Sequence, residues 1–268
     1  MNRLFQDLAR PLLAIVLFLL LQVVAGSSLL LLQLFGVIRV DGSDPLAFVE
    51  YGWLGAATFV CNIILVFICL RMFRKNRDGG TPVERQPAPW GRTVIALGGC
   101  ILGVIAMDLL SEMVDLPNLA EEQMLGMCNS PWGILAIAVG APVGEELLFR
   151  RGIIGHLLGR GRGVAVSIVM SALLFGLAHM NPSQMFFASI MGILLGILYW
   201  RSGSLAAPIL LHMLNNGAAC LEVRLLGEDV RTFSLVQSVG GEAVALVLTI
   251  VLSLACAGVM AWYVKEEK

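Results

Sequence analysis

Long apolar segments, repeated along the chain and separated by short polar ones, are the feature that most constrains its fold. The hydrocarbon core of a bilayer, about 30 Å thick, is crossed by a helix of about 20 residues. Of the 268 residues, 58% are hydrophobic and only 14% are charged, a composition unlike that of soluble domains. We therefore expect one all-α, polytopic membrane domain over residues 1–268, a bundle of about eight transmembrane helices. The predicted spans are 11–38, 51–73, 93–110, 132–159, 163–180, 184–199, 205–221 and 242–264, of which 184–199 is short enough to be tilted, kinked or partly re-entrant.

The distribution of Lys and Arg predicts the orientation, because short cytoplasmic loops carry the positive excess. Basic residues precede the first span, fill the 71–92 connection, recur at 160–162 and 201, and end the chain. The alternate connections are balanced or acidic, and 111–132 contains no Lys or Arg. We expect both termini in the cytoplasm, an exposed cytoplasmic linker at 75–90, and a retained first helix, because its apolar run is too long for a signal peptide.

Composition also bears on partners and on cysteine chemistry. The net charge of −1 indicates no partner, and the chain has no basic, aromatic-interleaved patch, so we expect no nucleic-acid ligand. No CxxC pair occurs, so the sequence suggests neither a disulfide framework nor a thiolate metal site. The cysteines are expected to be small apolar fillers, mostly within helices: Cys61, Cys69, Cys100, Cys128, Cys220 and Cys256.

Four charges interrupt the fourth predicted span, in the stretch APVGEELLFRRG at 141–152. A charge at mid-depth in a bilayer costs at least about 2.5 to 3.5 kcal/mol, so it needs a partner or a function. Glu146 and Arg150 are four residues apart on one helical face and can pair, whereas Glu145 is turned about 100° away. The alternative is that both acids lie near the interface while the arginines snorkel to headgroups.

Two further polar positions follow on later helices. If the turn after the fourth span lies near 161, Glu145 and His179 are both roughly 24 to 27 Å from it, and so at the same depth on adjacent antiparallel helices. His212 and Asn216 are four apart and share a helical face. Asn215 points elsewhere, where an amide commonly bonds to a neighbouring helix. Three helices thus present carboxylates, imidazoles and an amide to a common interior.

At these positions the sequence resembles a known family. Glu-Glu-x-x-x-Arg (145, 146, 150), Phe-x-x-x-His (175, 179) and His-x-x-x-Asn (212, 216) are similar to the three motifs of the CPBP family. This family comprises the CAAX-processing and bacteriocin-processing intramembrane proteases, with the Ras-converting CAAX endopeptidase as its eukaryotic member. The stretches EELLFRRG, GILLGILYWRSGSL and PILLHMLNN match the surroundings of those motifs. The resemblance covers about residues 132–220, the expected catalytic core.

The resemblance implies an intramembrane endopeptidase that cleaves a membrane-associated or lipid-modified protein or peptide with water activated on a glutamate. It makes Glu145 the general base, His179 the residue that polarises or shares the water, and His212 with Asn216 the donors to the oxyanion. Glu146, paired with Arg150, would hold the geometry of the site. Peptide hydrolysis needs a base and oxyanion donors, and these residue types supply both. We expect no cofactor, and an integral protein of a bacterial or archaeal inner membrane.

Two other functions use the same residues. In the first, Glu145, His179 and His212 hold Zn²⁺ and leave a fourth position open for water, as in a zinc metalloprotease. In the second, the protein is no enzyme but an immunity protein, a scaffold or a proton-coupled transporter. A transporter would show inverted repeats, whereas the Glu and His intrusions all lie in the second half of the chain. HExxH, Gly-x-Gly-Asp and Gly-x-Ser-Gly motifs are absent.

Overall fold

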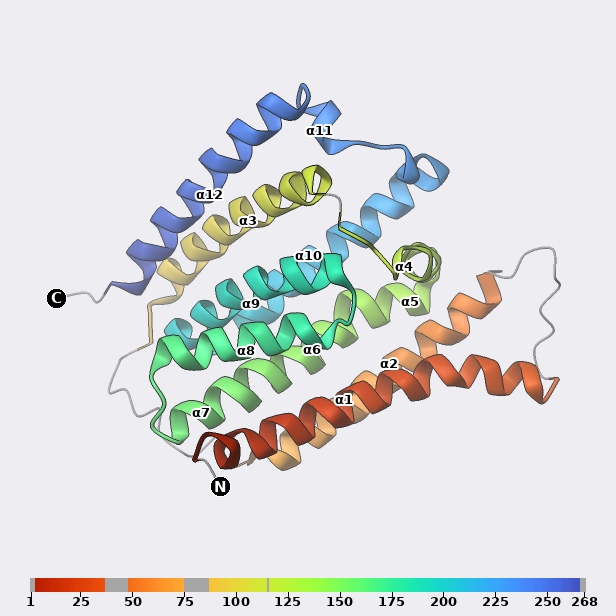
Figure 1. Ribbon diagram of the computed structural model, residues 1–268, viewed down its shortest axis with the longest axis horizontal. Coiled ribbons are helices and arrows are strands. Elements are labelled where there is room, and N and C mark those ends of the chain that lie inside the picture. Colours follow the sequence, from red (N-terminus) through yellow and green to blue (C-terminus); the bar gives the residue numbers. More distant parts are fainter. Residues whose placement is uncertain (1–2, 37–47, 75–86, 115, 266–268) are drawn as a thin grey trace. The chain divides into compact units, whose positions relative to one another are not determined.

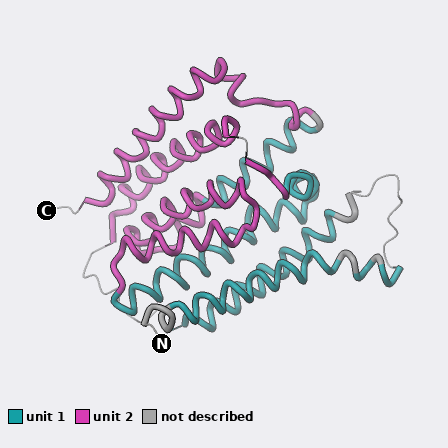
Figure 2. Tube along the Cα trace, in the orientation of Figure 1, with its two compact units in different colours: residues 1–80, 120–161, 212–227 teal, residues 81–119, 162–211, 228–268 magenta. Residues whose placement is uncertain are grey.

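The computed structural model describes residues 3–36, 48–74, 87–114 and 116–265, and every regular element in these residues is a helix (Figure 1). The chain divides into two compact units, each assembled from segments that are distant in sequence (Figure 2). Unit 1 comprises residues 1–80, 120–161 and 212–227, and unit 2 comprises 81–119, 162–211 and 228–268.

Unit 1 is built around α2 (Phe48–Met72), which packs on α1 (Arg3–Leu34) and on the continuous helical run Pro131–Gly159. The short α4 (Glu121–Cys128) precedes this run and also contacts α2. The part of α10 (Ala206–Leu226) that begins at residue 212 completes the unit. The run Pro131–Gly159 consists of α5 (Pro131–Leu135), η2 (Ala136–Gly140), α6 (Ala141–Glu146), η3 (Leu147–Ile154) and α7 (Gly155–Gly159).

The first residues of this run fix where it begins and how closely it packs. The Ser130 hydroxyl accepts a hydrogen bond from the Gly133 N–H, and Pro131 takes the first helical position, where its missing N–H costs nothing. A Cβ on Gly55 of α2 would overlap the backbone of Gly133. Small residues allow such close backbone approach where helices pack in membranes.

Two stretches of the run, η2 and η3, have π-helical hydrogen bonds, which reach back five residues instead of four. After η2 the Ala141 N–H donates to the Ala136 carbonyl, and after η3 the Gly155 N–H donates to the Arg150 carbonyl. Pro142, which follows Ala141, has no N–H to continue the pattern. Turns of this kind are frequent at functional sites, and the segment between them, α6, carries the two adjacent acids.

Unit 2 contains two pairs of packed helices, and α3 also contacts α9. One pair is α3 (Trp90–Met113) with α12 (Glu242–Val264), and the other is α8 (Val164–Ala178) with α9 (Pro182–Ser202). The short η4 (Gly227–Arg231) and α11 (Leu235–Ser238) lie between α10 and α12 in the sequence.

Two arginines hold the C-terminal end of α12. Arg92 donates from Nη2 to the Trp262 carbonyl at 2.8 Å, and Arg201 donates from Nε to the Tyr263 carbonyl at 3.1 Å. The last carbonyls of a helix have no donor within the helix, so these guanidinium groups supply what the helix end lacks. The positive charges are also favourable there, because the C-terminal end of a helix carries partial negative charge.

Each of the eight predicted ranges contains a described helix, and the all-α polytopic membrane bundle is confirmed. By length and composition, six of the described helices can cross a membrane. The remaining two predicted spans fall short: α8 is apolar but has 15 residues, and three polar side chains interrupt α10 at 212, 215 and 216. The six are Leu8–Ser28, Tyr51–Met72, Trp90–Met113, Pro131–Gly159, Pro182–Ser202 and Glu242–Val264.

Some helix ends differ from the predicted ones. The first helix begins at Arg3 rather than 11, so Pro11 lies inside it. The sixth predicted span is not short: α9 has 21 residues, because Pro182 starts it and Gly203, with a φ of 65°, ends it. The connection 111–132 contains α4, whose eight residues are too few to show a helical period in the sequence. Most of the predicted linker, 75–86, lies outside the described residues.

Candidate active site

The ion pair predicted in the fourth span is present in unit 1. Arg150 Nε lies 2.9 Å from Glu146 Oε2, and both side chains are fully buried. The pair joins α6 to the π-helical turn of η3. Because neither group is exposed, the snorkelling alternative is wrong for Arg150.

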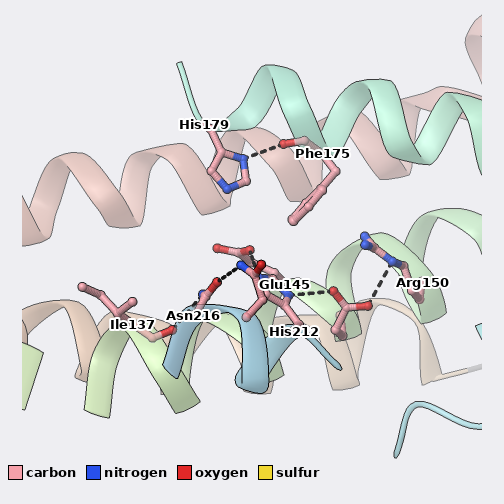
Figure 3. Close-up of polar contacts among 9 residues, drawn as sticks. Ile137, Glu145, Arg150, Phe175, His179, His212 and Asn216 are labelled. Atoms are coloured by element: carbon pink, nitrogen blue, oxygen red, sulfur yellow. Dashed lines mark hydrogen bonds and ion pairs between the residues drawn. The ribbon is translucent and has the colours of Figure 1, made fainter. Parts of the chain in front are cut away.

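His212 of α10 lies between the two adjacent glutamates (Figure 3). Its Nδ1 is 3.0 Å from Glu146 Oε1, and its Nε2 is 3.8 Å from Glu145 Oε2. The first contact is a hydrogen bond in which Nδ1–H donates to the carboxylate, and the second is too long to be one. All three residues are buried, with Glu145 7% exposed, Glu146 0% and His212 4%. Glu146 therefore orients the imidazole and holds its Nε2 edge beside Glu145.

Asn216, one turn after His212, is held by a backbone acceptor in η2 (Figure 3). Its Nδ2 donates to the Ile137 carbonyl at 3.0 Å, and its Oδ1 accepts from Asn215 Nδ2 at 3.1 Å. The π-helical pattern explains why that carbonyl needs a donor. Its partner five residues on would be the N–H of Pro142, which does not exist, while the Ala141 N–H already bonds to Ala136. A side-chain amide has two N–H groups, so Asn216 retains a second one.

His179 belongs to unit 2, where it directly follows the last residue of α8. Its Nδ1 is 2.8 Å from the Phe175 carbonyl, and the Phe175 ring packs edge-on against the imidazole at a centroid distance of 4.9 Å. A carbonyl only accepts, so Nδ1 carries a proton and the neutral ring has its lone pair on Nε2. Nε2 of His179 is thus the nitrogen available to accept a proton. The next residue, Met180, has a φ of 50°, a backbone conformation that is rare for residues other than glycine.

The structure brings together five of the six predicted site residues, all in unit 1: Glu145, Glu146, Arg150, His212 and Asn216. Two contacts were missed from the sequence. The bond from His212 to Glu146 joins residues 66 positions apart, and the bond from Asn216 to Ile137 joins residues 79 apart. Only the Asn216 contact could have been anticipated from the sequence. Pro142 has no N–H, so a carbonyl four or five residues before it is expected to lack its backbone donor.

Asn62 is a further polar residue of unit 1 that the sequence did not single out. It lies on α2 and is 1% exposed, and within the described part of the chain neither its Oδ1 nor its Nδ2 has a hydrogen-bond partner. A Cβ on Gly140 would be 3.3 Å from its Nδ2, so the amide packs against the end of η2. An unsatisfied buried amide is uncommon in folded proteins.

Zinc binding requires three or four donors converging on one point. Among the residues that the structure describes, no group of three His, Cys, Asp or Glu side chains is arranged to hold a metal ion. In unit 1 the Nδ1 of His212 donates to Glu146, which is also paired with Arg150. In this arrangement the side chains of unit 1 do not fit a zinc ion.

Comparison with known proteins points to one family. Residues 128–218 match the family model described as Type II CAAX prenyl endopeptidase Rce1-like. The membrane-embedded CAAX protease MroQ of Staphylococcus aureus (strain USA300) is 26% identical over 137 residues, which are 48% of this chain and 55% of that protein. The chain thus spans about half the length of the curated relative it matches, and no solved structure matches it. The matched segment contains all three motifs, and over this segment the chain is similar to the CPBP family of membrane proteins.

Proposed function

We propose that the protein is an intramembrane endopeptidase that cleaves a membrane-associated or lipid-modified protein or peptide in a bacterial or archaeal inner membrane. The observation that carries this proposal is the buried arrangement of Glu145, His212 and Glu146. A carboxylate beside an oriented imidazole can transfer protons to and from a substrate, as general acid–base catalysis requires. The names of the matched family model and of the staphylococcal relative, both CAAX proteases, support the same class of reaction.

In the proposed reaction Glu145 takes a proton from water, and the resulting hydroxide attacks the scissile carbonyl. Glu145 suits this role better than Glu146, because the carboxylate of Glu146 is already engaged by Arg150 and His212. From the resemblance to the second CPBP motif we assign His179 the second contact to the water, through the lone pair that Nε2 has when Nδ1 bonds to Phe175. After attack, protonated Glu145 delivers its proton to the leaving amine.

The oxyanion that forms on the carbonyl needs hydrogen-bond donors that are already in position. With both ring nitrogens protonated, His212 offers Nε2–H on the side facing Glu145, while Nδ1–H stays bonded to Glu146. In that state the charges of the two carboxylates are balanced by those of Arg150 and His212. A net charge of zero lowers the cost of burying these four side chains in a membrane protein. The second N–H of Asn216 is the other donor.

Cleavage of a prenylated peptide that ends in a CAAX sequence, by the purified protein in lipid vesicles, tests this function. Glu145→Gln should lower kcat/KM by about 10²- to 10⁴-fold, the usual contribution of a general base. His179→Ala should do the same, whereas His156→Ala, a buried histidine that packs edge-on against Phe73, serves as the matched control. Full activity of Glu145→Gln at an unchanged melting temperature would rule out the proposed base.

A zinc-dependent protease using Glu145, His179 and His212 is the second candidate, and chelation separates the two. We expect activity to persist after exhaustive treatment with o-phenanthroline or EDTA, with far less than one equivalent of zinc in the purified protein. Two features support metal-free chemistry: the Asn216 amide is a poor zinc ligand, and the Arg150 charge next to Glu146 opposes a dication. Stoichiometric zinc in the purified protein, with activity lost when the zinc is removed and restored when it is returned, would establish the metalloprotease instead.

A further inference from the structure

Two cysteines of unit 1, far apart in sequence, meet in its interior. Cys128 ends α4 and Cys220 lies in the second half of α10, and their Sγ atoms are 2.7 Å apart. Both residues are buried, at 0% and 2% exposure. Since 92 positions separate them, only the tertiary fold brings these thiols together.

The place of this thiol pair in the fold connects it to the candidate active site. Cys220 follows Asn216 by four residues and His212 by eight, so the three side chains lie along one face of α10. Cys128 lies three residues before Pro131, where the run carrying the glutamates begins. The geometry therefore places the thiol pair where a covalent bond would fix α10 to the start of that run.

A second contact and the sequence context support a cross-link here. Arg224 Nη1, one turn beyond Cys220, lies 3.5 Å from the Asn129 carbonyl, so the same two segments are also joined by a polar contact. Cys128 belongs to the connection 111–132, which has no Lys or Arg and which the distribution of positive charge assigns to the outer face. Disulfides form and persist on that side of a bacterial membrane, whereas the cytoplasm keeps thiols reduced.

We propose that Cys128 and Cys220 form a structural disulfide, made by exchange with a disulfide-bearing oxidant on the outer face of the membrane. One thiolate attacks the disulfide of the oxidant and releases one of its sulfurs as a thiol, and the second thiolate then attacks the mixed disulfide and releases the other. One S–S bond forms and one breaks, and the two electrons and two protons lost by the cysteines leave with the reduced oxidant. Because both sulfurs are buried, exchange takes place before α4 and α10 are packed, and the finished bond is shielded from reductants.

Counting thiols in the full-length protein tests this proposal without any assay of activity. Membranes are quenched in acid, and the protein is denatured in detergent and labelled with a maleimide of known mass, before and after reduction. The chain has six cysteines, so the disulfide predicts four labels before reduction and six afterwards. Six labels before reduction would overturn the proposal, as would a bond that proves to be intermolecular on a non-reducing gel.

Single substitutions identify the pair. Cys128→Ser and Cys220→Ser should each give five labels whether or not the protein is reduced. Cys100→Ser is the matched control, because Cys100 is equally buried and contacts Met260 Sδ at 3.5 Å instead of another thiol. That variant should give three labels before reduction and five after it, and a count of five in both states would assign the bond to Cys100.

A second measurement, which rests on the proposed function, asks whether the bond supports the site. Wild-type protein reduced under mildly denaturing conditions and then refolded should have a lower melting temperature and lower peptidase activity than the oxidised form. Cys128→Ser should show no such response to reduction. If the thiol count shows the disulfide but no peptidase activity is found in either form, the proposed function fails and the disulfide stands.

Discussion

Removing one member of the buried pair formed by Glu146 and Arg150 should destabilise the protein far more than removing an ordinary arginine. Both side chains are fully buried, so Arg150→Met removes the guanidinium from the Glu146 carboxylate and leaves an unbalanced negative charge where little water can solvate it. The cost of stranding a buried charge in this way is about 3 to 5 kcal/mol. At about 2 to 4 °C per kcal/mol for a chain of this size, the melting temperature should fall by about 6 to 20 °C.

A double-mutant cycle distinguishes a stranded charge from lost packing. Glu146→Gln should also destabilise, because Arg150 then lacks its carboxylate, although the amide oxygen can still accept from His212 Nδ1. The double variant Glu146→Gln/Arg150→Met removes both charges, and replacing a buried pair by uncharged groups is often neutral or stabilising. We therefore expect it to regain most of the stability that either single variant loses, which appears in the cycle as a large coupling energy.

The assay is thermal unfolding of the purified protein in detergent, followed with a dye that fluoresces on reacting with thiols, since all six cysteines are buried in the folded state. Arg151→Met is the control, because the neighbouring side chain is only half-buried and its loss should shift the melting temperature by about 2 °C or less. Equal shifts for Arg150→Met and Arg151→Met would refute the reasoning. A double variant whose loss equals the sum of the two single losses would refute it too.

Three further predictions concern other parts of the chain. Asn62→Leu should raise the melting temperature, because it removes a buried amide whose lack of partners costs about 1 to 3 kcal/mol, and a fall would show that the amide is satisfied. Gly176→Ala should lower the melting temperature, since its Cβ would overlap the Met185 carbonyl of α9 and overpacking costs about 1 to 3 kcal/mol; an unchanged value would contradict that packing. A cysteine at Leu119, which is 77% exposed, should react with an impermeant thiol reagent in intact cells, whereas one at Gly159 should react only after the membrane is opened, and the reverse result would invert the topology.

The helices were predictable because each carries its own signal in a continuous stretch of sequence. Apolar runs of about 20 residues predicted the spans, and the spacing of Glu146 and Arg150 predicted their pairing, since both depend only on local helix geometry. The elements that were missed are those with weak local signals. The short helix α4 lies in a polar stretch, and Pro11 suggested a helix start where α1 continues through it.

The detailed contacts of the candidate site could not be read from the sequence, because they depend on which helices pack together. Helical spacing placed His212 and Asn216 on one face but not which partner each would meet. Glu146 was expected to pair with Arg150 and to hold the geometry of the site. It also accepts a hydrogen bond from His212, because α10 packs against α6 closely enough for one. The meeting of Cys128 and Cys220 is of the same kind, since neither cysteine has a motif around it. The roles of the site residues in catalysis stay predictions.

The bond between Asn216 and the Ile137 carbonyl makes two distant positions dependent on each other during evolution. While Pro142 is present, replacing Asn216 by an apolar residue leaves a dry carbonyl without a donor, so that change is selected against even where catalysis does not matter. Once Pro142 is replaced, the restored N–H can fill the carbonyl from within its own helix, and position 216 is released from that constraint. Among descendants of this sequence, loss of the proline should therefore precede or accompany loss of the asparagine. A lineage that retained the proline but lost the asparagine would need a new donor, and a serine or threonine on a neighbouring helix turn is the simplest replacement.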